Sequence, residues 1–219
     1  KLEAAEDLPM ALHDMIKDTI AAHKRIIFNG NGYSDEWVVE AERRGLPNIK
    51  CMVDAVPALV KPEAVEIFEK HGVYTKAEME SRAEVMYETY SKTINIEALT
   101  MIDMAKKQIV PATIKYQTSL AESVNAIKAA SSAVDTSVQE ALMADISTNL
   151  KDMYAALAHL EEVAGKAEAM EEGAEQGHYY HDVVFTAMDE LRKPADKLEM
   201  LVAKSAWPFP SYGDLIFEV

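Results

Sequence analysis

The chain has 219 residues, and its 37 Asp and Glu outnumber its 22 Lys and Arg, which gives a formal net charge of −15. Only 16 of the 219 residues are Gly or Pro, about 7% against an ordinary ~12%, so the chain has few of the residues on which turn-rich β-sandwiches and barrels depend. We therefore expect an all-α protein with a few long helices, whose acidic surface argues against nucleic acid or an anionic membrane as its main partner.

The first 60 residues predict two short helices separated by a turn. Apolar residues recur at helical spacing over 8–20, which predicts an amphipathic helix there. Two consecutive Asn-Gly pairs in 25–33 are the clearest turn signal in the sequence. Ser34 is placed to cap a second helix, which Gly45 ends. Residues 46–61 are ambiguous, and we interpret them as a connection with a short helical turn.

The longest predicted helix follows a short one that runs from Pro62 to Lys70. Thr75 and Glu78 form a capping box at the start of this longest helix. Its apolar stripe spans 30 residues in 8 steps, or 3.75 residues per step, slightly more than a straight helix uses. Pro111 should kink or divide this helix, and helical spacing then resumes. The predicted stripe and its continuation are Met79, Ala83, Met86, Tyr90, Ile94, Ala98, Met101, Ala105, Ile109, Ile114, Leu120, Val124 and Ile127.

Two more helices are predicted beyond a reversal at 129–135. One has its apolar stripe over 138–160 and the other over 180–202, each with 22 residues in 6 steps. Gly173 and Gly177 should bracket the reversal between them, and Pro194 should bend the last helix.

The C-terminal segment differs from the rest of the chain. From Ser205 onward the spacing is not helical, and four aromatic residues lie within thirteen positions, which must be buried in this chain or on a partner. The predicted fold is a bundle of long antiparallel amphipathic helices with an irregular aromatic C-terminal tail.

Charge is concentrated in one part of the chain. Residues 135–200 hold 15 Asp and Glu against 5 Lys and Arg, which we interpret as solvated acidic helix faces. No apolar run approaches the ~18 residues of a membrane span, and no signal peptide is visible at the N-terminus. The single cysteine, Cys51, excludes an intrachain disulfide and a multi-cysteine zinc site. These features fit a reducing compartment, so we expect a cytoplasmic protein.

No motif in the sequence supports an active site. Glu175, His178 and His181 would share one helix face, but a di-iron bundle needs two E-x-x-H copies, so a capping or surface role is favoured over a metal site. The Asn-Gly loop at 29–32 could cradle an anion, but it lacks the P-loop and dinucleotide-binding patterns, and a structural turn is favoured. Cys51 has no histidine nearby in sequence. The sequence therefore predicts no catalytic, cofactor-binding or metal-binding residue.

Several segments nevertheless resemble one enzyme family, the type III glutamine synthetases. Segments similar to the end of that family's catalytic region are RIIFNGNGYSDEW at 25–37 and EAERRGLP at 40–47. A third segment, KTINIEALTMIDMAKKQ at 92–108, resembles the long helix that follows. The tail sequence WPFPSYGDLIF at 207–217 is similar to the family's C-terminal signature. The resemblance covers essentially the whole chain and is weakest over 129–177.

The resemblance implies that the intact enzyme joins ammonia to glutamate with ATP, through a γ-glutamyl phosphate, and needs Mg²⁺. The family's metal, ATP and arginine motifs lie upstream and are missing here. The chain then corresponds to the end of the catalytic region (1–60) and a helical C-terminal domain (61–219), inactive alone. Implied partners are the upstream catalytic domain and neighbouring subunits of a homo-oligomer, with a structural role in assembly.

Two other functions stay open from the residues themselves. The chain could be a metal-binding bundle that uses Glu175 and His178, or a stand-alone interaction module. A start codon directly before Lys1 would favour the module, and a continuous upstream synthetase region would favour the fragment.

Overall fold

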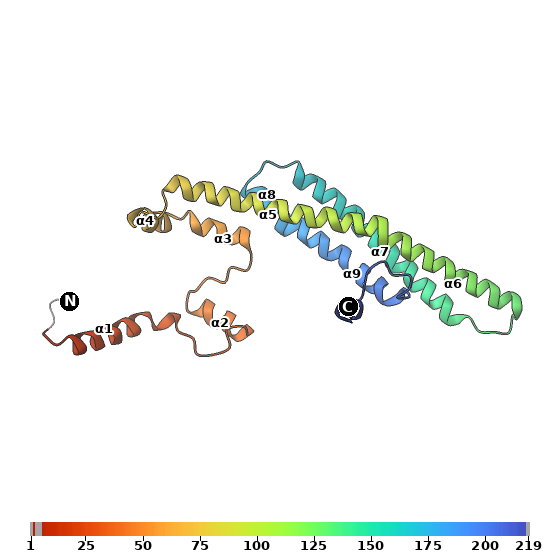
Figure 1. Ribbon diagram of the computed structural model, residues 1–219, viewed down its shortest axis with the longest axis horizontal. Coiled ribbons are helices and arrows are strands. Elements are labelled where there is room, and N and C mark those ends of the chain that lie inside the picture. Colours follow the sequence, from red (N-terminus) through yellow and green to blue (C-terminus); the bar gives the residue numbers. More distant parts are fainter. Residues whose placement is uncertain (1, 3–5, 218–219) are drawn as a thin grey trace. The chain divides into compact units, whose positions relative to one another are not determined.

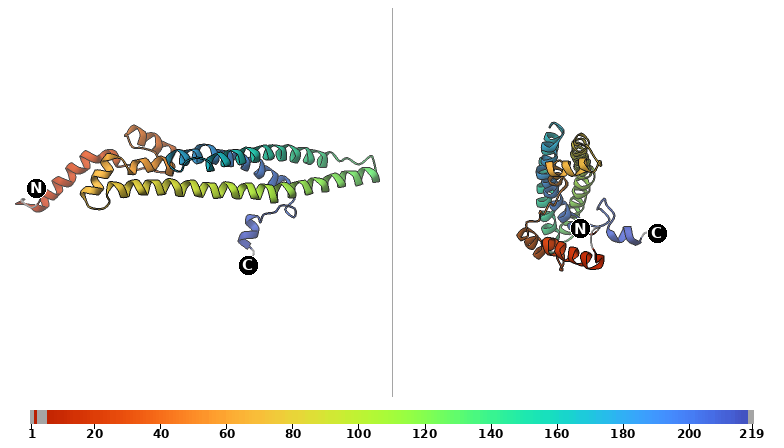
Figure 2. Two further views of the ribbon diagram at one scale, coloured as in Figure 1. Left: turned by 90° about the horizontal axis from the view of Figure 1, so that it is seen from above. Right: turned by 90° about the vertical axis from the view of Figure 1, so that its left-hand side faces the viewer.

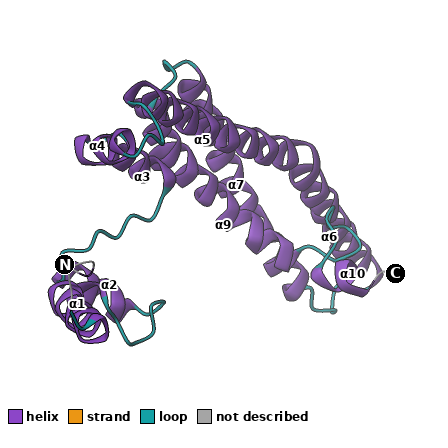
Figure 3. Cartoon of the chain, turned by 60° about the vertical axis from the view of Figure 1, so that its left-hand side comes forward, coloured by secondary structure: helices purple, strands orange, loops and turns teal. Residues whose placement is uncertain are grey.

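A computed structural model of the chain describes residues 2 and 6–217, and it confirms the all-α prediction. Helices and loops account for every described residue, without a strand (Figure 3). No helix in the described ranges is long and apolar enough to cross a membrane. The chain divides into two compact units, Lys1–Asp54 and Ala55–Val219.

The first unit contains the two helices that the sequence predicts. Helix α1 (Leu8–His23) begins at Asp7, whose Oδ1 accepts a hydrogen bond from the Met10 amide at 3.1 Å. Helix α2 (Asp35–Arg43) ends before Gly45, which takes φ +74°, a conformation that favours glycine. Ser34 occupies the expected capping position, but its hydroxyl donates to the Asn31 carbonyl at 3.0 Å and does not cap the helix.

Two short helices precede the bundle. Helix α3 (Met52–Leu59) contains Pro57 and replaces the single helical turn expected within 46–61. Helix α4 (Pro62–Lys70) has the predicted bounds and ends before Gly72, which has φ +63°.

The second unit is built along one continuous helical rod, which Figure 2 shows as α5 running into α6. Helix α5 (Lys76–Met104) opens with the predicted capping box, in which Thr75 and Glu78 bond each other's backbone amides. A π-helical segment, Ala105–Ile109, connects it to α6 (Val110–Ala130). Pro111 has no amide hydrogen, and its ring would clash with the carbonyl four residues back, so the wider π turn just before it accommodates the proline without ending the rod.

Two more helices pack along this rod. Helix α7 (Ser137–Glu168) runs back after the predicted reversal. Helix α8 (Ala174–Tyr179), the π-helical segment Tyr180–Val184 and α9 (Phe185–Leu201) then return in the original direction (Figure 1). The antiparallel bundle is thereby confirmed.

The second reversal differs from its prediction. Gly173 lies there with φ +141°, but Gly177 is a buried residue inside α8. Pro194 is buried within α9, which continues to Leu201. The bend expected at Pro194 stays a prediction.

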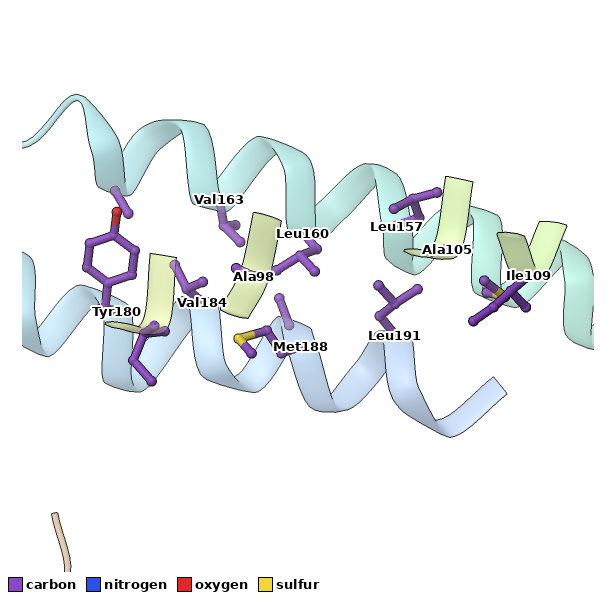
Figure 4. Close-up of a cluster of buried hydrophobic side chains, with 14 of the residues drawn as sticks. Ala98, Ala105, Ile109, Leu157, Leu160, Val163, Tyr180, Val184, Met188 and Leu191 are labelled. Carbon is purple, nitrogen blue, oxygen red and sulfur yellow. The ribbon is translucent and has the colours of Figure 1, made fainter. Parts of the chain in front are cut away.

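The core lies between the α5–α6 rod, α7 and α9 (Figure 4). Most predicted stripe positions are buried or half-buried. Two are wrong: Ile114 and Val138 are exposed. Thr113 takes the core position next to Ile114 because it lies four residues, about one turn, beyond Ile109.

The C-terminal tail is partly helical, which corrects the prediction of a wholly irregular segment. Residues 202–211 are irregular, and α10 (Tyr212–Phe217) follows. Trp207 and Phe209 pack against the bundle core with their rings 6.2 Å apart, edge to face. Tyr212 and Phe217 are 84% and 81% exposed. The tail is therefore anchored at its start and leaves an apolar end in solvent.

Candidate functional site

The Asn-Gly loop of the first unit is held against α2 by one side chain, Arg44. Its guanidinium donates to the carbonyl oxygens of Arg25, at 3.2 Å, and of Ile27. It also donates to Glu40 at 2.6 Å. Five donors in a planar fork allow one arginine to make all these bonds at once. Arg44 therefore links the backbone before the loop, at Arg25 and Ile27, to the end of helix α2, which follows the loop.

Aromatic packing beside the Arg44 guanidinium holds the same loop. The rings of Phe28 and Trp37 stack with their centroids 4.3 Å apart. The Arg44 guanidinium lies 5.8 Å and 6.0 Å from these two ring centroids, within range of a cation–π interaction. A Cβ at Gly30 would lie 2.4 Å from the Phe28 ring, so any larger residue there would displace the ring.

Electrostatics strengthen this cluster. Hydrogen bonds from Arg43 and then Arg44 lower the pKa of Glu40 to about 2. The carboxylate is therefore ionised throughout the physiological range and keeps both guanidinium groups in place.

The tip of the loop is ordered by Asn31 and presents one aromatic ring. The Asn31 Oδ1 accepts from the Tyr33 amide at 3.0 Å, and the Ser34 amide donates to the Asn31 carbonyl at 3.3 Å. The amides of both residues that follow the Asn-Gly loop are thus already bonded within the turn. The Tyr33 side chain is fully exposed.

The E-x-x-H segment lies beside α5. The His178 ring centroid is 6.5 Å from that of Tyr87, and the His181 centroid is 6.5 Å from that of Tyr90. The His181 Nδ1 lies 2.7 Å from an oxygen of Asp182. Across residues 6–217 no three His, Cys, Asp or Glu side chains are grouped so that they could hold a metal ion.

Cys51 is a poor candidate nucleophile. Its Sγ lies 3.0 Å from an Asp54 oxygen. Burial, followed by this carboxylate, raises the pKa of the thiol. Since the thiolate is the nucleophilic form, the surroundings of Cys51 disfavour reactivity at neutral pH.

An apolar cavity of about 230 Å³ lies where the tail meets the bundle. Trp207 and Phe209 form one wall, and the end of α5, the π-helical segment after it, α7 and α9 supply the remainder. The sequence predicted that the tail aromatics need a partner, and the structure provides it for these two residues within the chain.

Comparison with known proteins defines the class of this bundle. The family model described as "Glutamine synthetase C-terminal domain" matches residues 11–128, which is more than half of the chain. The chain therefore belongs to the glutamine synthetase C-terminal domain family, as the resemblance implied.

Individual relatives carry the same name. A glutamine synthetase from Butyrivibrio fibrisolvens is 37% identical over 99% of this chain and 31% of its own length. A type-3 glutamine synthetase from Dictyostelium discoideum is 29% identical over 94% of this chain and 29% of its own length. A glutamine synthetase from Bacteroides fragilis shows the same identity and coverage. The chain thus spans less than a third of the length of the curated relatives it matches.

Sequence reasoning missed the contacts that order the loop. Arg44, Phe28 and Trp37 all lie in the segments that carry the family resemblance, but nothing in their spacing shows that they meet. The aromatic and arginine content of so short a stretch was the available signal.

Proposed function

We propose that this chain is the C-terminal part of a longer glutamine synthetase, and that it serves the structure and assembly of the enzyme. The coverage of the relatives carries this proposal: nearly all of the chain aligns, but only to about 30% of their length. The intact enzyme would join ammonia to glutamate with ATP and Mg²⁺ in the cytoplasm. In that chain, residues 1–60 would complete the catalytic region, and 61–219 would form the helical C-terminal domain.

The apolar face of α1 supports a contact with the preceding part of the polypeptide. Four apolar residues at helical spacing are each 42–51% exposed, and no residue of α1 is buried. They are Leu12, Met15, Ile16 and Ile20. Covering such a stripe contributes roughly 25 cal/mol for each Å² removed from water. The upstream region would supply the covering surface.

The exposed end of the tail supports a contact between subunits. Four large apolar residues of α10 are 66–84% exposed, although the tail is anchored to the bundle a few residues earlier. They are Tyr212, Leu215, Ile216 and Phe217. Held at a fixed place on the bundle, they would pack on a neighbouring copy in a homo-oligomer.

Deletion of residues 205–219 from the whole polypeptide tests the assembly role. We expect a smaller assembly in size-exclusion chromatography with light scattering, and reduced glutamine formation. A Tyr212→Ser, Phe217→Ser double variant separates the exposed contact from the anchor, because it leaves Trp207 in place. Unchanged assembly and activity in both variants would refute the role.

The 219-residue chain alone should make no glutamine from ATP, glutamate, ammonia and Mg²⁺. Measurable turnover by the purified chain would overturn this part of the proposal. The gene provides the simplest test of the whole proposal. We expect an upstream synthetase region of several hundred residues continuous with Lys1, and a start codon immediately before Lys1 would refute it.

A further inference from the structure

The Asn-Gly loop carries two asparagines, each followed directly by a glycine. Asn29 precedes Gly30, and Asn31 precedes Gly32. In such a pair the backbone nitrogen of the glycine can attack the side-chain carbonyl carbon of the asparagine, because glycine has no side chain that hinders the approach. Both asparagines are exposed to water. The surroundings of the two pairs differ, however, in packing and in hydrogen bonding.

Packing in the loop requires a glycine after Asn29. A Cβ at position 30 would lie 2.4 Å from the Phe28 ring, and this ring is held in place by its stack with Trp37, with centroids 4.3 Å apart. A Cβ at Gly32 would have no neighbour within 4 Å. The first glycine, which makes the asparagine before it susceptible to attack, is therefore also the one that the fold of the loop needs.

Hydrogen bonds hold the second asparagine but not the first. The Asn31 Oδ1 accepts from the Tyr33 amide at 3.0 Å, and the Asn31 carbonyl accepts from the amide and the hydroxyl of Ser34. Within residues 6–217, neither the Asn29 side chain nor the Gly30 amide makes a hydrogen bond. Rotation of the Asn29 side chain towards the next amide therefore breaks no hydrogen bond within the chain, whereas the same rotation of Asn31 breaks one.

We propose that Asn29 is a site of spontaneous deamidation and that the turn protects Asn31. The Gly30 nitrogen loses its proton to water and attacks the Asn29 Cγ, which closes a five-membered succinimide. The side-chain amide nitrogen takes up a proton and leaves as ammonia. Water then adds to either carbonyl carbon of the succinimide and opens the ring. The products are aspartate and isoaspartate, and each adds one negative charge at neutral pH.

The modified residue would lie in the segment whose ends Arg44 joins. The Arg44 guanidinium holds the Ile27 carbonyl, two residues before Asn29, and Arg44 itself ends helix α2. Aspartate keeps the length of the backbone between these points. Isoaspartate lengthens the backbone by one carbon atom directly before Gly30, where packing against Phe28 leaves no room for a Cβ. Of the two products, isoaspartate is therefore the one that disturbs the loop.

Peptide mass spectrometry of the purified 219-residue chain, sampled during incubation at mildly alkaline pH, tests the proposal. Deamidation replaces an amide NH₂ by OH, and the fragment masses assign the change to one asparagine or the other. We expect Asn29 to convert about fivefold faster than Asn31, since Asn31 has to break its hydrogen bond with the Tyr33 amide first. Equal rates, or faster conversion of Asn31, would overturn the proposal.

The unfolded chain is the matched control for the effect of structure. Incubated in urea at the same pH, the two Asn-Gly pairs should convert at similar rates, because the packing and the turn are lost. Asn29→Gln should remove most of the acidic species that ion-exchange chromatography resolves in the folded chain. Asn31→Asp, which keeps the acceptor oxygen of the turn, should leave the rate at Asn29 unchanged. The same ratio of rates in folded and unfolded chains, or undiminished formation of acidic species in Asn29→Gln, would refute the assignment.

Discussion

Removing the Trp207 side chain should release the tail from the bundle. The indole packs on the core and makes an edge-to-face pair with Phe209, and it is partly buried. An aromatic side chain in this setting removes roughly 100 Å² or more from water, worth about 2.5 kcal/mol at ~25 cal/mol per Å². The edge-to-face pair adds about 0.5–1 kcal/mol. Because Trp207 lies in a wall at the surface of the bundle, its loss opens the cavity to solvent and creates no sealed void.

We therefore expect Trp207→Ala to lower the free energy of unfolding of the bundle by about 3 kcal/mol. Urea unfolding followed by far-UV circular dichroism measures it, with the denaturant slope as a check that the unfolding reaction is unchanged. Tyr212→Ala is the matched control: its ring is 84% exposed, and such surface changes stay within about 0.5 kcal/mol. A loss below about 1 kcal/mol for Trp207→Ala, or equal losses for the two variants, would contradict the division of the tail into an anchored and an exposed part.

Three further predictions concern single polar groups. Thr113→Val should raise the free energy of unfolding by about 1 kcal/mol, because the fully buried hydroxyl lacks a partner in the described structure and valine has the same shape. A lower free energy of unfolding, measured with urea, would contradict this. Thr75→Ala should lower the free energy of unfolding by about 1 kcal/mol, because the capping box is lost. Thr75→Ser keeps the hydroxyl and should leave the free energy of unfolding unchanged. Hydrogen bonds from Lys204 and then Ser211 lower the pKa of Asp214 from 3.8 to about 2. Since the folded pKa is the lower one, this stabilisation of the tail is complete above pH 4 and is lost as the pH falls towards 2. Hydrogen exchange of α10 should accelerate in that window, and Asp214→Asn should remove the dependence.

The bounds of several elements followed from local chemistry alone. Pro62, Gly72 and the Thr75–Glu78 capping box specify helix ends through bonds within one or two turns, so the sequence was sufficient. Ser34 shows the limit of this reasoning. Its predicted position at the helix start was right, but its hydroxyl donates to the Asn31 carbonyl in the preceding turn. Residue spacing alone does not show which of these two local hydrogen bonds a serine makes.

The sites depended on contacts between distant residues, and for that reason the sequence did not reveal them. Arg44 bonds carbonyl groups 17 and 19 residues away. A polar hollow of about 330 Å³ in the bundle is likewise lined by Ser91 of α5 and Gln176 of α8, which lie 85 positions apart.

The π-helical segment before Pro111 was signalled by the helical period. Eight turns of α-helix use about 29 residues, whereas the stripe from Met79 to Ile109 uses 30. The excess of about one residue is what one widened turn inserts. The structure places that turn at Ala105–Ile109, where the Val110 amide bonds the Ala105 carbonyl five residues back.

The second π-helical segment, Tyr180–Val184, had no such signal. The stripe over 180–202 has the same period as the stripe over 138–160, although α7 is regular throughout its length. The two π-helical segments differ in how close the next proline lies. Pro111 lies two residues past the first segment, whereas Pro194 lies ten residues past the second. The first segment is thus explained by the need to accommodate a proline in a long rod. The second segment has no proline close enough to create this need, so the same explanation does not extend to it.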